Sequence, residues 1–245
     1  MRPRYGIGPV ALACAAVAAA VLCASISRIG PLAAAIEERP LPAVRVAEVP
    51  HHLIAGAYRG DYQFTTDWFT YNIPVWEKIF APYRGKPGVR YLEIGAFEGR
   101  SVVWLLENVL TDPTDRITAI DVFYGDYEAR YRSNVATFGR RVETIKAPSQ
   151  IALRQLPLES FDIIYIDGSH ATADVLEDAV LSWRLLKPAG MLIFDDYEWI
   201  GAFNTGHAGD AAADWPKAAI DSFCRCFAGK FDVVHNANQV VLRKH

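Results

Sequence analysis

The stretch YLEIGAFEGRS, residues 91–101, places two glycines between two apolar segments. The segment before them, VRYLEI (residues 89–94), is typical of a strand, and SVVWLLENVL (residues 101–110) has the apolar spacing of a helix. Gly95 and Gly99 bracket the turn, where the missing Cβ allows positive φ and a close approach of backbone to a ligand. The stretch therefore predicts a strand–turn–helix unit whose turn can bind a ligand.

The same alternation of strand and helix continues to the C-terminus. The further strand patterns are RITAID (116–121), RVETIK (141–146), FDIIYID (161–167), GMLIFDD (190–196) and a pair within FDVVHNANQVVLRK (231–244), turning at residues 236–238. Repeated β–α units with continuous Val, Ile and Leu strands indicate a parallel sheet covered on both faces. We therefore predict an α/β fold with an antiparallel strand pair at one edge.

Composition limits the class of protein and of partner. A chain of 245 residues with 51% hydrophobic and 22% charged residues can form one globular domain with additional segments. A net charge of −3 gives no basic surface, so we expect no nucleic-acid partner. Cys224 and Cys226 form an isolated C-x-C without further ligands at zinc spacing, so we expect reduced, structural cysteines.

The N-terminal segment, residues 1–30, has its own character. Arg2 and Arg4 precede an uncharged stretch that lasts until Arg28, and its Ala-rich core, residues 10–26, approaches the roughly 20 residues that cross a bilayer. Three interpretations stay open: an uncleaved anchor, a cleaved signal ending near PLAAAIEE (31–38), and a start codon chosen too far upstream.

Between this segment and the alternating region we predict a linker and a helical cap. Residues 31–63 are rich in proline and without sustained period, which is typical of a linker. Residues 64–84 have a helical pattern with Thr66 or Asp67 as N-cap, and Pro74 makes two short helices as plausible as one. The proposed main domain is therefore 64–245, with 64–84 as its cap.

Polar residues follow the predicted strands. In open parallel sheets, ligands bind at the carboxyl ends of the strands, so these positions are candidate site residues. The turn after Glu93 has the spacing G-x-x-x-G and not G-x-G-x-x-G, which argues against an NAD-dependent oxidoreductase. Asp195 and Asp196 are adjacent acids, which are costly to bury unless a cation or donors compensate them. Metal binding and helix capping both stay open for this pair.

Four motifs in order resemble the class I S-adenosylmethionine-dependent methyltransferases. They are YLEIGAFEGRS (91–101), ITAIDVF (117–123), FDIIYIDGSH (161–170) and LLKPAGMLIFDDY (185–197), and the similarity extends over residues 89–243. More narrowly, they resemble metal-dependent O-methyltransferases of small molecules and sugars with an IDG-x-H motif. The resemblance implies a Rossmann-like sheet of seven strands, mostly parallel, with an antiparallel last strand and helices on both faces.

The resemblance also implies the cofactors and the roles of the site residues. S-adenosylmethionine would be bound by Glu93, Gly95 and Gly99 at its methionine end and by Asp121 at its ribose; from its place after the third strand, Ser149 is expected near the adenine. Mg²⁺ would be held by Asp167, Asp195 and Asp196, although related enzymes often have Asn in place of the last. His170 would be the general base that deprotonates the acceptor hydroxyl.

The leading functional prediction is therefore methyl transfer to a hydroxyl of a small molecule or sugar. The alternatives are an oxidative, hydroxylase-like enzyme and a membrane-tethered module that binds the cofactor without turnover. Because S-adenosylmethionine is a cytoplasmic metabolite, we expect the domain to face the cytoplasm and to be attached to the membrane by residues 1–30. Without a native N-terminal segment it would be cytoplasmic, and with a cleaved signal it would be exported.

Overall fold

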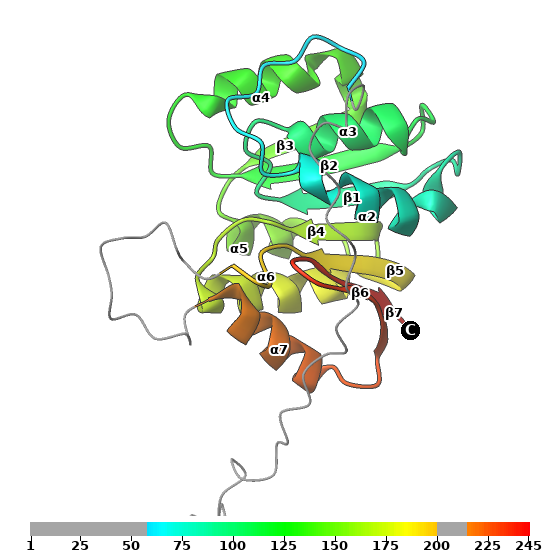
Figure 1. Ribbon diagram of the computed structural model, residues 1–245, viewed down its shortest axis with the longest axis vertical. Coiled ribbons are helices and arrows are strands. Elements are labelled where there is room, and N and C mark those ends of the chain that lie inside the picture. The colour runs from blue at the N-terminus through cyan, green and yellow to red at the C-terminus, as the bar shows by residue number, and fades with distance from the viewer. Residues whose placement is uncertain (1–57, 200–214) are drawn as a thin grey trace, which may run out of the picture. The chain divides into compact units, whose positions relative to one another are not determined.

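The computed structural model describes residues 58–199 and 215–245, which form a seven-stranded sheet of order β3-β2-β1-β4-β5-β7-β6 (Figure 1). The strands are β1 (Arg90–Ile94), β2 (Arg116–Asp121), β3 (Val142–Lys146), β4 (Phe161–Ile166), β5 (Leu186–Phe194), β6 (Phe231–Asn236) and β7 (Val240–Lys244). Strands β1 to β5 pair in parallel, and β7 pairs antiparallel with β5 and β6. The predicted mostly parallel sheet with an antiparallel last strand is confirmed.

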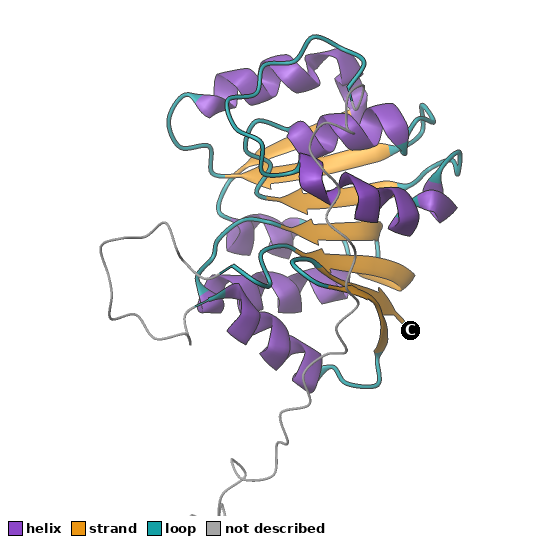
Figure 2. Ribbon diagram, in the orientation of Figure 1, coloured by secondary structure: helices purple, strands orange, loops and turns teal. Residues whose placement is uncertain are grey.

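Helices cover both faces of this sheet (Figure 2). They are α2 (Ile73–Ile79), α3 (Arg100–Asn108), α4 (Tyr127–Val135), α5 (Ser149–Ala152), α6 (Thr172–Leu185) and α7 (Pro216–Cys226), with short 3₁₀ turns η3 (Thr70–Asn72), η4 (Ala81–Tyr83), η5 (Ala136–Arg141) and η6 (Leu153–Gln155). Helix α3 packs against α4, and α6 packs against α5 and α7. Helices α3 to α7 alternate with the strands, as the sequence pattern predicted, and α2 precedes β1.

The strands are buried on both faces, which explains their continuous apolar sequences. In β1, the neighbouring residues Tyr91 and Leu92 point to opposite faces, and both are fully buried. Tyr91 joins the cluster under α2 and α3, together with Trp76 and Trp104. Because helices cover both faces of the sheet, the loops at the strand ends are the parts open to a ligand.

The segment before β1 is less helical than its sequence pattern suggested. It is an irregular stretch over residues 58–69, followed by η3, α2 and η4. Asp67 Oδ1 accepts hydrogen bonds from the backbone N–H groups of Phe69 (3.3 Å) and Thr70 (2.9 Å), as an N-terminal cap does. Pro74 lies in the first turn of α2, where proline needs no N–H partner, so the alternative of short, separate helices is the one observed.

The structure corrects the prediction of membrane attachment. Within residues 58–199 and 215–245, no helix is long and apolar enough to cross a bilayer. The longest described helix, α6, has 14 residues, whereas a crossing takes about 20 apolar ones. The apolar stretch on which the prediction rested lies outside the described residues. The membrane partner and the membrane-anchored localisation are therefore withdrawn.

A carboxyl group is buried in the centre of the sheet. Glu93 of β1 is fully buried, and it accepts hydrogen bonds from Tyr91 Oη (3.0 Å) and from Ser101 Oγ. Burial raises the pKa of Glu93 from 4.5 to about 8, with smaller contributions from the charges of Asp121 and Asp195. The protein without cofactor thus holds a proton at Glu93 near neutral pH, which the unfolded chain does not.

We expect Glu93 to make the stability of the cofactor-free protein fall as the pH rises from about 4.5 to about 8. The folded pKa lies above the unfolded one, so the stabilisation is complete below pH 4.5 and is lost as Glu93 ionises. Glu93→Gln should remove this dependence, and its stability relative to wild type should rise by a few kcal/mol, on the order of 1.4 kcal/mol per pKa unit. Urea unfolding between pH 5 and 9 measures the difference.

The matched control is Glu143→Gln, which changes an exposed glutamate of β3. Its stability should follow wild type at every pH. If the free energies of unfolding of wild type and Glu93→Gln changed with pH in parallel, the raised pKa of Glu93 would be contradicted.

Candidate active site

The ends of four parallel strands meet at one edge of the sheet. Backbone hydrogen bonds join the residues that follow them: Gly95 N to Ile120 O (2.9 Å), Asp167 N to Ile94 O (2.8 Å) and Asp195 N to Ile166 O (3.0 Å). The strand register thus places the turns after β1, β2, β4 and β5 side by side. This is the edge at which the sequence motifs predicted a site.

The turn after β1 depends on two glycines. Gly95 has φ +90°, and a Cβ at this position would lie 1.9 Å from the backbone oxygen of Asp167. Gly99 has φ +80° and begins α3, with the Tyr131 ring 3.1 Å from where its Cβ would be. Only glycine allows this close approach of the β1 turn to the end of β4.

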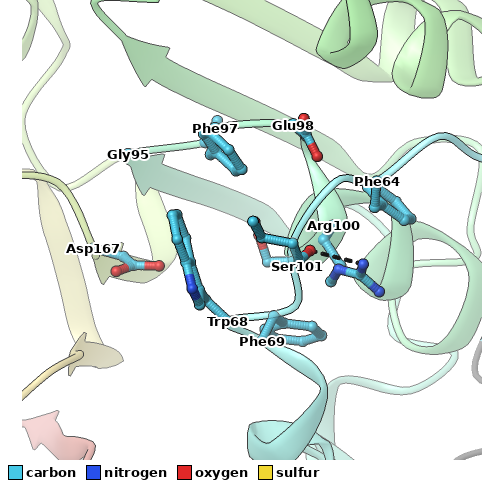
Figure 3. Close-up of a pocket in the computed structure, with 11 residues that line it drawn as sticks. Phe64, Trp68, Phe69, Gly95, Phe97, Glu98, Arg100, Ser101 and Asp167 are labelled. Carbon is cyan, nitrogen blue, oxygen red and sulfur yellow. Dashed lines mark hydrogen bonds between the residues drawn. The ribbon is translucent and has the colours of Figure 1, made fainter. Parts of the chain in front are cut away.

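A pocket lies between this turn and the segment before the first helix (Figure 3). Gly95, Phe97 and Asp167 line it from the strand ends, and Phe64 and Trp68 line it from the opposite wall. Figure 3 shows the Trp68 ring beside the Asp167 carboxyl. Trp68 is 65% exposed and its ring lies 5.1 Å from that of Phe97. The sequence predicted residues 64–84 as a helical cap and did not mark Phe64 or Trp68 as site residues.

Polar contacts fasten this wall to the sheet. The buried carboxylate of Glu98, in the β1 turn, accepts hydrogen bonds from Thr65 N (2.6 Å) and Thr65 Oγ1 (2.8 Å) and forms an ion pair with Arg130. These donors hold the pKa of Glu98 below its usual range, against the opposing effect of its burial. Arg100 of α3 stacks on the Phe64 ring (4.2 Å) and donates to Thr66 O (2.8 Å).

Asp121 lies at the end of β2 with its carboxylate turned to the loops. Its oxygens accept hydrogen bonds from Phe97 N (2.8 Å) and Phe123 N (2.7 Å). Both phenylalanines have positive φ, 46° and 51°, an unfavourable conformation for a bulky residue that is often found at binding sites. Ser149 begins α5, and its hydroxyl is hydrogen-bonded to Asp178 of α6. Ser149 is not among the residues that line the pocket.

The acids after β4 and β5 meet at one hydroxyl. Tyr165 Oη lies 3.0 Å from Asp167 Oδ2 and also contacts Asp195 Oδ2. Burial first, and the neighbouring carboxylates second, raise the pKa of Asp167 well above its usual range and that of Asp195 to about 6. The Tyr165 hydroxyl has one hydrogen and can donate to only one of the two carboxyl groups. Both contacts are hydrogen bonds when the other carboxyl group is protonated and donates to Tyr165 Oη.

Asp196 pairs with His170. Asp196 Oδ2 lies 2.8 Å from His170 Nε2, and this hydrogen bond raises the pKa of His170. The imidazole stacks on Trp199, with ring centroids 4.5 Å apart, and its side chain is 45% exposed. Asp196 has φ +57° and no described helix begins there, so the structure gives no support to a capping role.

The three acids predicted as metal ligands do not surround a common point. Among the residues that the structure describes, no group of three or more His, Cys, Asp or Glu is arranged to hold a metal ion. Carboxylate oxygens suit Mg²⁺ in their chemistry. In this arrangement, however, Asp167 and Asp195 face the Tyr165 hydroxyl, and Asp196 faces His170.

Comparison with known proteins agrees with this geometry. Residues 92–197 match the family model described as a methyltransferase domain. The chain is 30% identical over 122 residues to the uncharacterized protein R132 of Acanthamoeba polyphaga mimivirus, which covers 46% of this chain and 53% of that protein. It is 30% identical over 116 residues to the O-methyltransferase hkm8 of Aspergillus hancockii, covering 46% and 45% of the two chains. The chain thus spans about half the length of these relatives.

A solved structure shares the fold. The methyltransferase MycE of the mycinamycin biosynthetic pathway, solved with Mg and S-adenosylhomocysteine, superposes with a TM-score of 0.53 at 18% identity, covering 73% of this chain and 51% of MycE. The sheet order, the strand-end site and the matched residues lead to the same assignment as the sequence motifs. Residues 92–197 are thus similar to a methyltransferase domain, and the fold agrees with the resemblance to the class I S-adenosylmethionine-dependent methyltransferases.

Proposed function

We propose that the protein transfers a methyl group from S-adenosylmethionine to a hydroxyl group of a small molecule. The observation that carries the proposal is the His170–Asp196 pair, in which His170 follows by three residues Asp167, a residue that lines the pocket. A base that is held by a carboxylate and open to solvent can take a proton from an acceptor and pass it on. The match to O-methyltransferase hkm8 supports this class of acceptor.

The pocket residues fit the cofactor. Gly95 and Phe97 bring backbone to the pocket, the aromatic rings of Phe64 and Trp68 close it opposite, and Asp121 offers oxygens that can accept from ribose hydroxyls. When bound, S-adenosylmethionine supplies an electrophilic methyl group on a sulfonium. The protein's part is then to exclude water, to orient the acceptor and to remove its proton.

The proton would be removed by neutral His170. The hydrogen bond from the ring to Asp196 fixes the imidazole orientation, and the carboxylate stabilises the imidazolium that forms. Stacking on Trp199 limits rotation of the ring. Because the imidazole is about half exposed, solvent can accept the proton after each turnover.

We further propose that Mg²⁺ takes part, held by the carboxylates of Asp167, Asp195 and Asp196. Their donor chemistry and the Mg in the MycE structure support the proposal. Bound metal would lower the pKa of an acceptor hydroxyl. Each carboxyl group would offer the metal an oxygen other than the Oδ2 that contacts Tyr165 or His170.

Asp121→Asn should weaken binding of S-adenosylhomocysteine by about tenfold or more, because a neutral amide replaces a charged acceptor of ribose hydroxyls. Isothermal titration calorimetry measures the Kd. Asp162→Asn is the control, since Asp162 also accepts a backbone N–H (Arg90 N, 2.9 Å) but lies at the start of β4, at the opposite edge of the sheet. Absence of binding by wild type would refute the proposed function.

His170→Asn should lower kcat by about 100-fold or more while the Kd for S-adenosylhomocysteine stays within about twofold, because the base acts on the acceptor. Methyl transfer from labelled cofactor to a panel of phenols, sugars and aliphatic alcohols measures the rate. A variant with wild-type kcat would remove His170 from the mechanism. A wild type that binds cofactor but methylates no acceptor would favour a module without turnover.

Asp195→Asn should weaken Mg²⁺ binding by about tenfold or more, measured by calorimetry with S-adenosylhomocysteine present, because one charged oxygen ligand is lost. Asp162→Asn again serves as control and should bind Mg²⁺ as wild type does. Wild-type protein that shows no heat with Mg²⁺ and keeps its activity in EDTA would refute the metal proposal alone.

A further inference from the structure

A buried path of hydrogen bonds runs from helix α2 to the strand-end acids. Trp76 Nε1 of α2 donates to Gln239 Oε1 (2.8 Å), and Gln239 Nε2 donates to Tyr165 Oη (3.4 Å). Tyr165 Oη in turn contacts Asp167 and Asp195. We call it the Trp76–Gln239–Tyr165 path. Its three residues come from α2, the turn between β6 and β7, and β4, and each is at most 2% exposed.

The direction of this path follows from the chemistry of its groups. An indole N–H can only donate, so it fixes the carbonyl oxygen of the Gln239 amide toward Trp76. The amide nitrogen must then face Tyr165, and the tyrosine oxygen accepts. Because Gln239 donates to the Tyr165 oxygen, the Tyr165 hydroxyl hydrogen points at Asp167 and Asp195 and not at Gln239.

The turn between β6 and β7 also contacts Asp195 directly. Asn238 Nδ2 lies 3.5 Å from Asp195 Oδ1, and Asn72 Nδ2 of η3 lies 3.5 Å from Asp195 Oδ2. Asn238 O also accepts a hydrogen bond from Tyr197 N (2.8 Å). Amide groups from both flanking segments therefore surround the carboxyl group that follows β5.

We propose that Gln239 is a positioning residue, which holds the Tyr165 hydroxyl and through it the carboxyl groups of Asp167 and Asp195 in the geometry that the reaction needs. The inference rests on the proposed function for its catalytic consequence. Gln239 and Trp76 both lie outside residues 92–197, the part that matches the methyltransferase family. The site thus depends on two segments of this chain that the family match does not include.

Packing alone does not account for this arrangement. The Trp76 ring packs edge-on against Tyr165, with centroids 5.1 Å apart, and an apolar side chain in place of Gln239 would fill the same volume. A buried amide costs free energy unless its partners are present, and here one of the two partners, Tyr165, contacts the acids. The polar group is therefore explained by what it orients.

Gln239→Leu tests the proposal, since leucine keeps most of the volume and removes the amide. We expect kcat for methyl transfer to fall by about tenfold because displaced carboxyls orient the acceptor poorly. The Kd for S-adenosylhomocysteine should stay within about twofold, because neither Gln239 nor Tyr165 lines the pocket. Trp76→Phe, which removes the indole N–H, should lower kcat in the same direction by a smaller factor.

Trp104→Phe is the matched control for loss of a buried indole. Trp104 is 2% exposed and its ring centroid lies 5.9 Å from that of Trp76 in the same cluster, whereas the indole that donates to Gln239 is that of Trp76. Trp104→Phe should lower the stability of the protein and leave kcat at the wild-type value. Equal loss of kcat, cofactor affinity and stability in Gln239→Leu would reduce Gln239 to a structural role and overturn the proposal.

NMR spectroscopy tests whether Gln239 positions the carboxyl groups, and it needs no measurement of catalysis. The ¹³C carboxyl resonances of Asp167 and Asp195, assigned by their loss in Asp167→Asn and Asp195→Asn, should shift in Gln239→Leu and stay in place in Trp104→Phe. Unchanged resonances in Gln239→Leu would overturn the proposal. Wild-type protein that binds no S-adenosylhomocysteine would instead refute the proposed function, and the resonances would still report whether Gln239 positions the acids.

Discussion

The close approach of the β1 turn to the end of β4 is the constraint on which the site depends. β1 lies between β2 and β4, so its turn must pass the backbone of Asp167 at a distance that excludes any side chain at Gly95. Gly95 and Asp167 both line the pocket, and Asp167 meets Asp195 at the Tyr165 hydroxyl. The strained backbone of Phe97 and of Asp196 flanks the same contact.

Electrostatics at this edge are dominated by carboxyl groups. Asp167 and Asp195 share the Tyr165 hydroxyl, and His170 pairs with Asp196. The basic side chain of Arg100 is engaged with the segment before α2. Burial first, and repulsion between the carboxyl groups second, raise the pKa values of Asp167 and Asp195. A positively charged sulfonium or cation therefore suits the site better than an anionic ligand does, because a positive charge would relieve that repulsion.

The sequence predicted the parts of the fold that depend on local pattern. Strand and helix alternation gave the sheet, and the residues after each strand gave the edge where Asp121, Asp167 and Asp195 lie. It did not predict the contacts made across long separations. Trp76 meets Gln239 over 163 positions, and Thr65 meets Glu98 over 33, and no periodicity encodes either pairing. The burial of Glu93 was missed for a related reason, since an acid at a strand end is equally compatible with an exposed and a covered position.

The pocket wall also has a spectroscopic consequence. Trp68 is largely exposed, lines the pocket and packs against the Phe97 ring, whereas Trp76 and Trp104 are buried in the core. A molecule that enters the pocket therefore changes the solvent around the Trp68 indole, while the indoles of Trp76 and Trp104 stay buried. The protein contains its own fluorescent reporter of occupancy, so ligands of the pocket can be ranked by emission before any acceptor is known.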